Sequence, residues 1–261
     1  MSFDIIDFHI HPFLDPKDNI CAHRSFSNMS VENTADLLGG LGISKFCGSV
    51  LRPGSREGES AWDKVREAND IALQLRDAYG GMYVPGFHIH PDYIEESIEE
   101  IHRMSALGVR LIGEIVPSYF GDWGEYNREE FSILLDEAEK YNMIVNLHTK
   151  GNTAMDELVK RHPNLVVVGA HPGEYDTLMR HVERVKMSEN YYIDLSGTGI
   201  TRYGALKRLV DMVGADRLVF GTDFPACNPV MWVNAVLGDR LLTDGQKEKI
   251  LSLNAKRLLG I

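Results

Sequence analysis

The chain has 261 residues, of which 44 % are hydrophobic and 25 % are charged, so it carries enough apolar material for a large buried core. Its formal net charge of −11 argues against binding to DNA, RNA or an anionic membrane through overall charge. The 3 cysteines form no CxxC pair, which argues against a disulfide framework and a thiolate zinc site and favours a reducing compartment.

The beginning of the sequence, MSFDIIDFHIHPF, lacks the basic region and the apolar region of a signal peptide. No stretch approaches the about 18 uninterrupted apolar residues that a membrane-spanning helix needs. We therefore expect a cytoplasmic protein that does not bind membranes or nucleic acid. Its expected partner is a small-molecule substrate, and a homodimer is compatible with a chain of this size.

Short apolar runs alternate along the chain with longer amphipathic segments. These runs are rich in Val, Ile and Tyr, and such runs are typical of parallel strands that are covered on both faces. Each run is therefore predicted to be a strand. The predicted strands span residues 3–10, 43–51, 82–89, 109–116, 143–147, 165–170, 191–195 and 218–220.

The segments between the runs carry helix signals. The spacing of a helix cap and its partner occurs at 60–63, 92–95 and 153–156, and a last helix is predicted over 243–259, with Gly260 as its stop. Alternating strands and helices predict an α/β protein with a single-domain (β/α)8 TIM barrel over residues 1–261. An open doubly wound sheet is the alternative, but no Gly-rich phosphate turn follows the first run.

Polar residues that bind metals end several predicted strands. Asp7, His9 and His11 are two residues apart, so they share one face of the first strand. The carboxyl ends of barrel strands meet at one mouth, where active sites lie. Four further strand ends carry Glu114, His148, His171 and Asp223.

Neutral imidazoles and carboxylates that come from several strands are the ligands that a divalent cation needs. One histidine after a strand is usually a satisfied polar residue, but coincidence at several strand ends favours a metal site. Zinc is the expected metal, as one or two ions, with manganese or iron as alternatives. The predicted ligands are His9, His11, Glu114, His148, His171 and Asp223.

On these residues the sequence resembles the amidohydrolase superfamily, and within it the amidohydrolase-2 branch, which contains both hydrolases and nonoxidative decarboxylases. The matching segments are DFHIH at 7–11, NLHT at 146–149, GAHPG at 169–173, GTDFP at 221–225 and NAKRLLGI at 254–261. The resemblance implies that Asp223 is the general acid and base and that His171 is a ligand or steadies a developing oxyanion. Glu114 resembles the bridging carboxylate of two-metal members such as TatD-type deoxyribonucleases; alternatively, it holds a ligand histidine.

The resemblance implies a metal-dependent hydrolase that uses activated water to cleave a C–O or C–N bond in a small ester, lactone or amide. The alternative is a metal-dependent decarboxylase, and a TatD-like nuclease is disfavoured by the acidic charge. A barrel that keeps a metal only for structure is disfavoured because a rim of ligands around a mouth is open. The candidate substrate-binding residues are Arg52, Lys150, Ser196 and Arg202.

Overall fold

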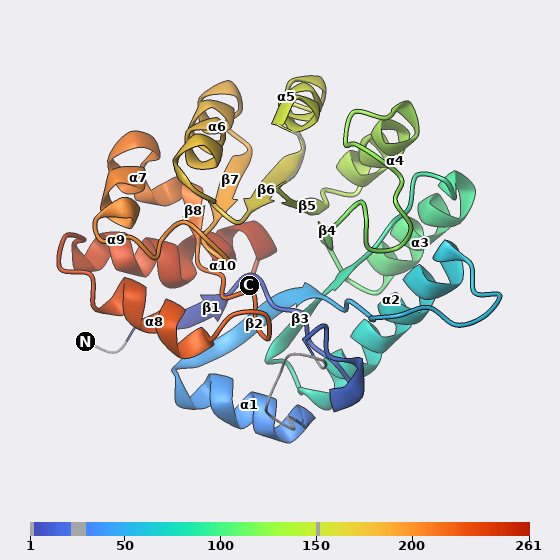
Figure 1. The fold of residues 1–261 in the computed structure, drawn as a ribbon, viewed down its shortest axis with the longest axis horizontal. Helices are drawn as coiled ribbons and strands as arrows, with labels where there is room; N and C mark the ends of the chain where they lie inside the picture. Colours follow the sequence, from blue (N-terminus) through green and yellow to red (C-terminus); the bar gives the residue numbers. More distant parts are fainter. Residues whose placement is uncertain (1–2, 22–29, 150–151) are drawn as a thin grey trace.

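The computed structural model describes residues 3–21, 30–149 and 152–261. Eight parallel strands form one sheet in the order in which they occur along the chain, with the helices outside them (Figure 1). All of the predicted strands are confirmed, with ends that shift by a few residues. The strands are β1 (Ile5–Asp7), β2 (Ile43–Ser49), β3 (Tyr83–Phe87), β4 (Leu111–Ile115), β5 (Ile144–His148), β6 (Val166–Ala170), β7 (Tyr191–Asp194) and β8 (Leu218–Val219).

Backbone hydrogen bonds join the two ends of this sheet. The N–H of Phe8 donates to the carbonyl oxygen of Phe220 at 2.7 Å, and the N–H of His11 donates to that of Phe224 at 2.7 Å. These bonds lie just beyond β1 and β8, so the sheet closes on itself. The predicted (β/α)8 barrel is therefore confirmed, and the open doubly wound sheet is excluded.

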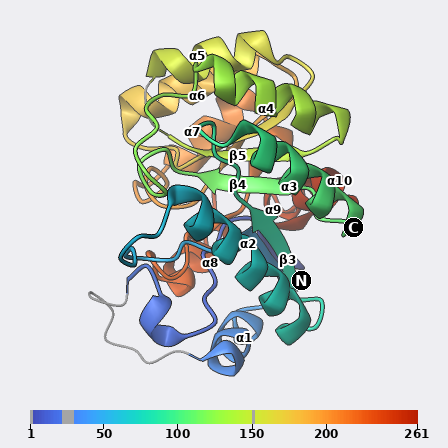
Figure 2. The same cartoon turned by 90° about the vertical axis from the view of Figure 1, so that its right-hand side faces the viewer.

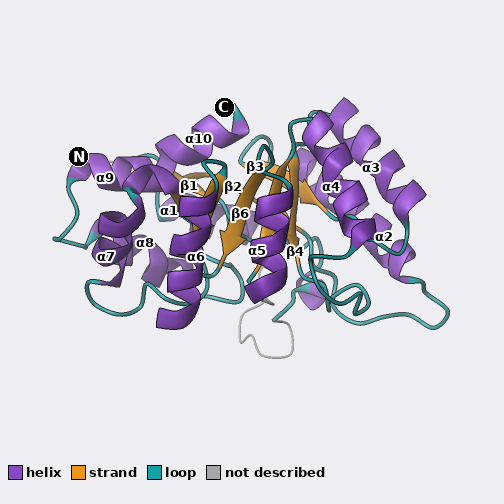
Figure 3. Ribbon diagram, turned by 90° about the horizontal axis from the view of Figure 1, so that it is seen from above, coloured by secondary structure: helices purple, strands orange, loops and turns teal. Residues whose placement is uncertain are grey.

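The helices form the outer layer, as Figures 2 and 3 show from two further directions. Ser60 caps its helix through a reciprocal capping box with Asp63, as predicted. The helices that connect the strands are α1 (Val31–Gly40), α2 (Ala61–Ala78), α3 (Ile94–Ala106), α4 (Glu129–Lys140), α5 (Asn152–Arg161), α6 (Tyr175–Met187) and α7 (Ala205–Val213), and α8 (Pro229–Leu237) follows β8.

Two predicted helix caps are wrong. The helix α3 begins after Tyr93 without a side-chain cap, because the Asp92 carboxylate instead pairs with the Arg128 guanidinium at 2.8 Å. The helix α5 already begins at Asn152, so Thr153 lies inside its first turn. Both differences arise from contacts or boundaries that a local spacing rule does not contain.

The C-terminal helix is confirmed in its ends but is interrupted in its middle. Thr243 caps α9 (Asp244–Glu248), a π-helical turn follows over Lys249–Leu253, and α10 (Asn254–Leu259) ends at Gly260 with a φ of 72°. Within the π turn, the carbonyl of Ile250 accepts from the N–H of Phe220 at 3.0 Å. The interruption thus coincides with a hydrogen bond that ties the C-terminal helix to the barrel wall.

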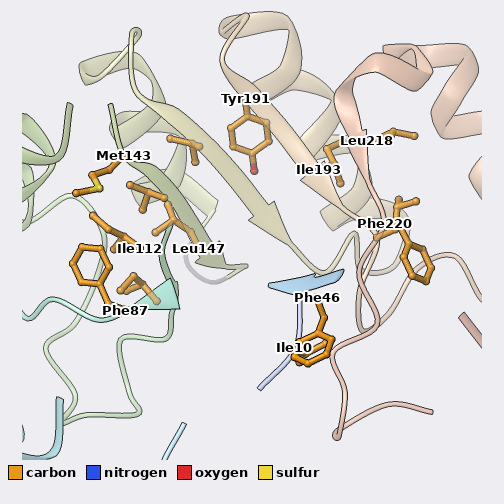
Figure 4. Packing of buried hydrophobic residues seen from close by; sticks show 14 of the residues in the cluster. Ile10, Phe46, Phe87, Ile112, Met143, Leu147, Tyr191, Ile193, Leu218 and Phe220 are labelled. Carbon is orange, nitrogen blue, oxygen red and sulfur yellow. The ribbon is translucent and has the colours of Figure 1, made fainter. Parts of the chain in front are cut away.

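Apolar side chains fill both faces of the barrel wall. Side chains such as Phe46, Ile112 and Ile193 pack between the strands and the helices (Figure 4). The alternate strand residues form a second cluster, which includes Ile6 and also Leu258 from α10. The side-chain alternation of each strand therefore separates a helix-facing core from an inner one, and polar groups occupy the strand ends.

A buried carboxylate strengthens the junction between the first and last strands. Asp7 is 0 % exposed and accepts from the N–H and the hydroxyl of Thr222 at 2.9 and 2.5 Å. We predict that Thr222→Val lowers the free energy of unfolding by about 1–3 kcal/mol, because the carboxylate loses a buried donor. Urea denaturation measures this change. The same substitution at the exposed Thr201 should have almost no effect, and equal effects at both sites would contradict the prediction.

Candidate metal centre

Four imidazoles and two carboxylates converge at the carboxyl end of the barrel. They arise from five different strands, so the closed sheet sets their relative positions. Within the described residues, their donor atoms form overlapping groups in which all atoms lie within 4.8 Å of one another. The structure thus brings together all of the predicted ligands, which are His9, His11, Glu114, His148, His171 and Asp223.

Glu114 lies at the centre of this cluster and is only 3 % exposed. Its Oε2 atom is 3.4 Å from Nε2 of His9 and 3.3 Å from Nε2 of His11. Its Oε1 atom is 2.8 Å from Nδ1 of His148 and 3.0 Å from Nε2 of His171. Each carboxylate oxygen therefore faces a different pair of imidazoles.

Asp223 lies near the first pair of imidazoles. Its Oδ1 atom is 3.7 Å from Nε2 of His9 and 3.5 Å from Nε2 of His11. Asp223 and His171 adopt left-handed backbone conformations, with φ of 62° and 61°, which are uncommon for residues other than glycine. Such strained conformations concentrate at functional sites, here at the points where the chain leaves β6 and β8.

The Nδ1 atoms of His9 and His11, the first pair of imidazoles, form hydrogen bonds with groups outside the cluster. Nδ1 of His9 is 2.5 Å from Oδ2 of Asp194, and Nδ1 of His11 donates to the carbonyl oxygen of Ser49 at 3.0 Å. With Nδ1 occupied, each ring directs its Nε2 atom towards the cluster centre. Carboxylate and carbonyl partners of this kind orient metal-binding histidines.

Ser196 lies behind the rings instead of in the substrate space. Its hydroxyl is 3.1 Å from Nδ1 of both His9 and His171, and the residue is 0 % exposed. Gly197 packs against the ring of His171, and a Cβ atom there would overlap Nδ1. The geometry therefore supports an orienting role for Ser196 and gives no support to the predicted contact with substrate.

The electrostatics of the cluster fit a bound cation. Burial disfavours the charged form of His9, but the carboxylates of Asp194 and Glu114 outweigh it and raise the pKa of His9 well above its ordinary value. Burial alone would raise the pKa of Glu114, yet the His9 and His171 imidazoles hold it well below its ordinary value. A cavity of ionised carboxylates and directed imidazoles is suited to a divalent metal ion.

The cluster opens into a cavity of about 670 Å³. Asp223 and the rings of His148 and His171 form one part of its wall, so a molecule in the cavity can reach the donor atoms. The remaining lining is Thr149, Gly173, Glu174, Thr177, Gly197, Thr198 and Cys227.

Two of the predicted basic substrate ligands, Arg52 and Arg202, are not among the described residues that line this cavity. Arg52 is 5 % exposed and is bound to the carboxylates of Glu59 and Glu67, the latter at 3.1 Å. Arg202 is largely exposed and pairs with Glu174 at 2.9 Å. The neighbouring carboxylates neutralise both guanidiniums, so their positions give no support to a role in binding substrate. Lys150 lies outside the described residues.

Asp194 is the functional residue to which the sequence analysis gives no role. It ends β7, is fully buried, and also accepts from the side-chain amide of Asn146 at 3.3 Å. The signal that could have found it is the same one that found the ligands, a carboxylate at the carboxyl end of a predicted strand. Its partner, His9, is far away in the sequence, so the pairing is visible only in the folded chain.

The fold, a closed (β/α)8 barrel with polar strand ends, defines the class of the protein. The amidohydrolase-2 family model, described as amidohydrolase, matches residues 6–261. The chain therefore belongs to the amidohydrolase-2 family, as the sequence motifs predict. Among curated proteins, none matches the sequence.

Solved structures share this fold over the full chain. A 2,6-dihydroxybenzoate decarboxylase from Rhizobium is similar with a TM-score of 0.75 and 17 % identity, covering 100 % of this chain and 99 % of that one. A 5-carboxyvanillate decarboxylase from Sphingomonas paucimobilis is similar with a TM-score of 0.72 and 15 % identity, covering 100 % of both chains. The corresponding enzyme from Novosphingobium aromaticivorans, solved with manganese, is similar with a TM-score of 0.73 and 15 % identity, covering 100 % of this chain and 97 % of that one. At these identities the similarity shows the shared fold.

Within the described ranges, no helix is both long and apolar enough to span a membrane. The described residues do contain clusters that could hold a divalent metal, whereas the choice of zinc stays a prediction. Hydrolysis also stays a prediction, since the named neighbours above are decarboxylases.

We predict that Asp194→Asn weakens metal binding by about 10- to 100-fold, because His9 loses the charged partner that orients its ring. Titration of the metal-free protein with Mn²⁺ or Zn²⁺ in competition with a chelator measures this change. Asp211→Asn on α7 is the matched control, since Asp211 is exposed and pairs only with Lys207 among the described residues. Equal affinities of the two variants would contradict the orienting role.

Proposed function

We propose that the protein is a metal-dependent hydrolase that cleaves a C–O or C–N bond in a small ester, lactone or amide. The observation that carries this proposal is the position of Glu114, whose two oxygens face separate pairs of imidazoles. A carboxylate in that position is suited to bridge two divalent cations, and two-ion sites favour hydrolytic chemistry.

We assign the donor atoms to two sites according to the Glu114 oxygen that each imidazole faces. Oε2 of Glu114 would share one cation with the first group, and Oε1 would share the second cation with the other group. The first group is His9, His11 and Asp223, and the second is His148 and His171. All these donors are nitrogen or carboxylate oxygen, which suits zinc and also manganese or iron.

A divalent cation, when bound, supplies Lewis acidity that lowers the pKa of its water to near neutral. The chain itself supplies the acid–base group. Asp223 lines the cavity and is 15 % exposed, so its carboxylate can accept a proton from the attacking water. The water oxygen bonds to the scissile carbonyl carbon, and Asp223 returns the proton to the oxygen or nitrogen that leaves.

His171 has a separate role in this proposal. Its ring also lines the cavity, and the Ser196 hydroxyl lies 3.1 Å from its Nδ1 atom. The Nε2 atom, 3.0 Å from Oε1 of Glu114, would hold the second cation, and His171 would in this way help to stabilise the negative charge that develops on the substrate oxygen. A directed donor or ligand near that oxygen stabilises the transition state more than the ground state.

A metal-dependent nonoxidative decarboxylase is the second candidate. The solved structures favour it, because the named neighbours are decarboxylases and one is solved with manganese. In that reaction the C–C bond to the carboxylate breaks, carbon dioxide leaves, and an acid such as Asp223 protonates the carbon that keeps the electron pair. The cavity lining contains no Lys or Arg among the described residues, so a substrate carboxylate would depend on the cation for its binding.

The acidic character of the chain and its cavity does not support a nuclease. Phosphate contacts dominate the affinity of proteins for nucleic acid, and the described lining offers the carboxylates of Glu174 and Asp223 but no Lys or Arg. We therefore propose a small molecule as the substrate. A homodimer and a cytoplasmic location remain predictions.

The two reactions differ in what happens to water. Metal-loaded protein is screened in ¹⁸O-labelled water against esters, lactones and amides, and against 2,6-dihydroxybenzoate and 5-carboxyvanillate. We predict incorporation of ¹⁸O into the acid product without release of carbon dioxide. Release of carbon dioxide from a carboxylated substrate, with no ester, lactone or amide hydrolysed, would instead support the second candidate.

We further predict that Asp223→Asn lowers kcat at least about 100-fold, because it removes the group that carries the proton. Circular dichroism should show an unchanged fold. Asp77→Asn is the control, since its side chain is 79 % exposed and remote from the cluster. Full activity of Asp223→Asn would overturn the assignment of this residue.

A further inference from the structure

A chain of buried polar side chains runs from the cavity wall into the barrel wall. Thr149 lines the cavity beside His148, and its Oγ atom is 3.0 Å from Nε2 of His181 on α6. Nδ1 of His181 is 2.7 Å from the hydroxyl of Tyr191 on β7. His181 and Tyr191 are both 0 % exposed, so water does not compete for these hydrogen bonds.

The direction of the chain is set by the phenol at its buried end and by a carbonyl group at its cavity end. The Thr149 hydroxyl contacts the carbonyl oxygen of Ala170 closely, and a carbonyl oxygen can only accept, so the hydroxyl donates to it. Burial raises the pKa of Tyr191 to about 12, so the phenol keeps its hydrogen at neutral pH. Among the described residues, the acceptor bonded to that hydrogen is Nδ1 of His181.

The direction then passes through His181 to the cavity. Burial and the Arg184 guanidinium lower the pKa of His181 to about 3, so its ring is neutral and carries one N–H. Because Nδ1 accepts from Tyr191, the hydrogen lies on Nε2, which donates to Oγ of Thr149. The threonine hydroxyl donates in turn to the carbonyl oxygen of Ala170, which it contacts closely.

The packing around these hydrogen-bonded side chains is tight. Gly169 on β6 lies against it, and a Cβ atom there would overlap both the Tyr191 hydroxyl and the His181 ring. The side chains are thus closely packed against the backbone of β6, which keeps the hydrogen-bonded atoms near one another.

We propose that Thr149 is a specificity-determining residue that offers the cavity only a lone pair and so selects ligands with an N–H or O–H donor. A hydroxyl ordinarily donates or accepts, but the Thr149 hydrogen is committed to Ala170. The donor of the ligand would lie beside the group that reaches the metal centre, because Thr149 follows His148 directly. This inference rests on the proposed function, and it favours a secondary amide or a hydroxylated ester over a tertiary amide.

Two small chelators isolate this contact. Acetohydroxamate and N-methylacetohydroxamate bind a metal through the same two oxygens, but only the first has an N–H donor. Their affinities for manganese-loaded protein are measured by calorimetry for the wild type, Thr149→Val and Thr149→Ser. The change in the ratio of the two affinities between the wild type and a variant cancels any intrinsic difference between the chelators.

We expect the preference for the N–H compound to fall about 3- to 10-fold in Thr149→Val and to be retained in Thr149→Ser, which keeps the hydroxyl. A preference that is the same in all three proteins would overturn the inference. Failure of both chelators to bind any of the three proteins would refute the metal centre of the proposed function. The inference about Thr149 would then be decided by the NMR measurement on His181.

The state of His181 is read independently by ¹⁵N NMR of the histidine-labelled protein, with His181→Gln to assign its signals. The inference requires a neutral ring with its hydrogen on Nε2, unchanged across the neutral pH range. A hydrogen on Nδ1, or a ring that gains a proton in that range, would reverse the direction of the chain and overturn the inference.

Discussion

The Glu114 carboxylate, buried between four imidazoles, is the constraint on which the rest of the site depends. An ionised carboxylate with 3 % exposure is costly unless positive charge or hydrogen-bond donors surround it. In this barrel the surrounding groups come from separate strands, so no local segment can satisfy Glu114. The carboxylate has all four of these partners only in the closed sheet, and the same closure aligns the donors for a cation.

The groups that hydrogen-bond the proposed metal ligands explain how the site keeps its geometry. Asp194 and the Ser49 carbonyl orient the first pair of rings, and Ser196 lies between His9 and His171. These partners come from β2 and β7, strands that provide none of the proposed ligands. Almost every strand therefore contributes either a donor or a group that holds a donor, which is consistent with a barrel whose mouth is specialised for chemistry.

Much of the fold and the ligand set could be predicted because both depend on regular patterns. Continuous apolar runs report buried parallel strands, and the residues that end them share one mouth, which is why Glu114 and His148 could be predicted together. The pairing of His9 with Asp194 and the direction of the Thr149 chain depend on contacts between distant strands. Asp92 shows the same limit at a helix end, since its tertiary ion pair with Arg128 replaces the cap that the local spacing predicts.

The division of donors between two cations is tested most directly by anomalous diffraction from crystals of the metal-loaded protein. The account predicts two metal peaks on either side of Glu114. One would contact His9 and His11, and the other would contact His148 and His171. A single peak with Glu114 outside its coordination sphere would contradict the two-ion hydrolase and leave the decarboxylase as the better candidate.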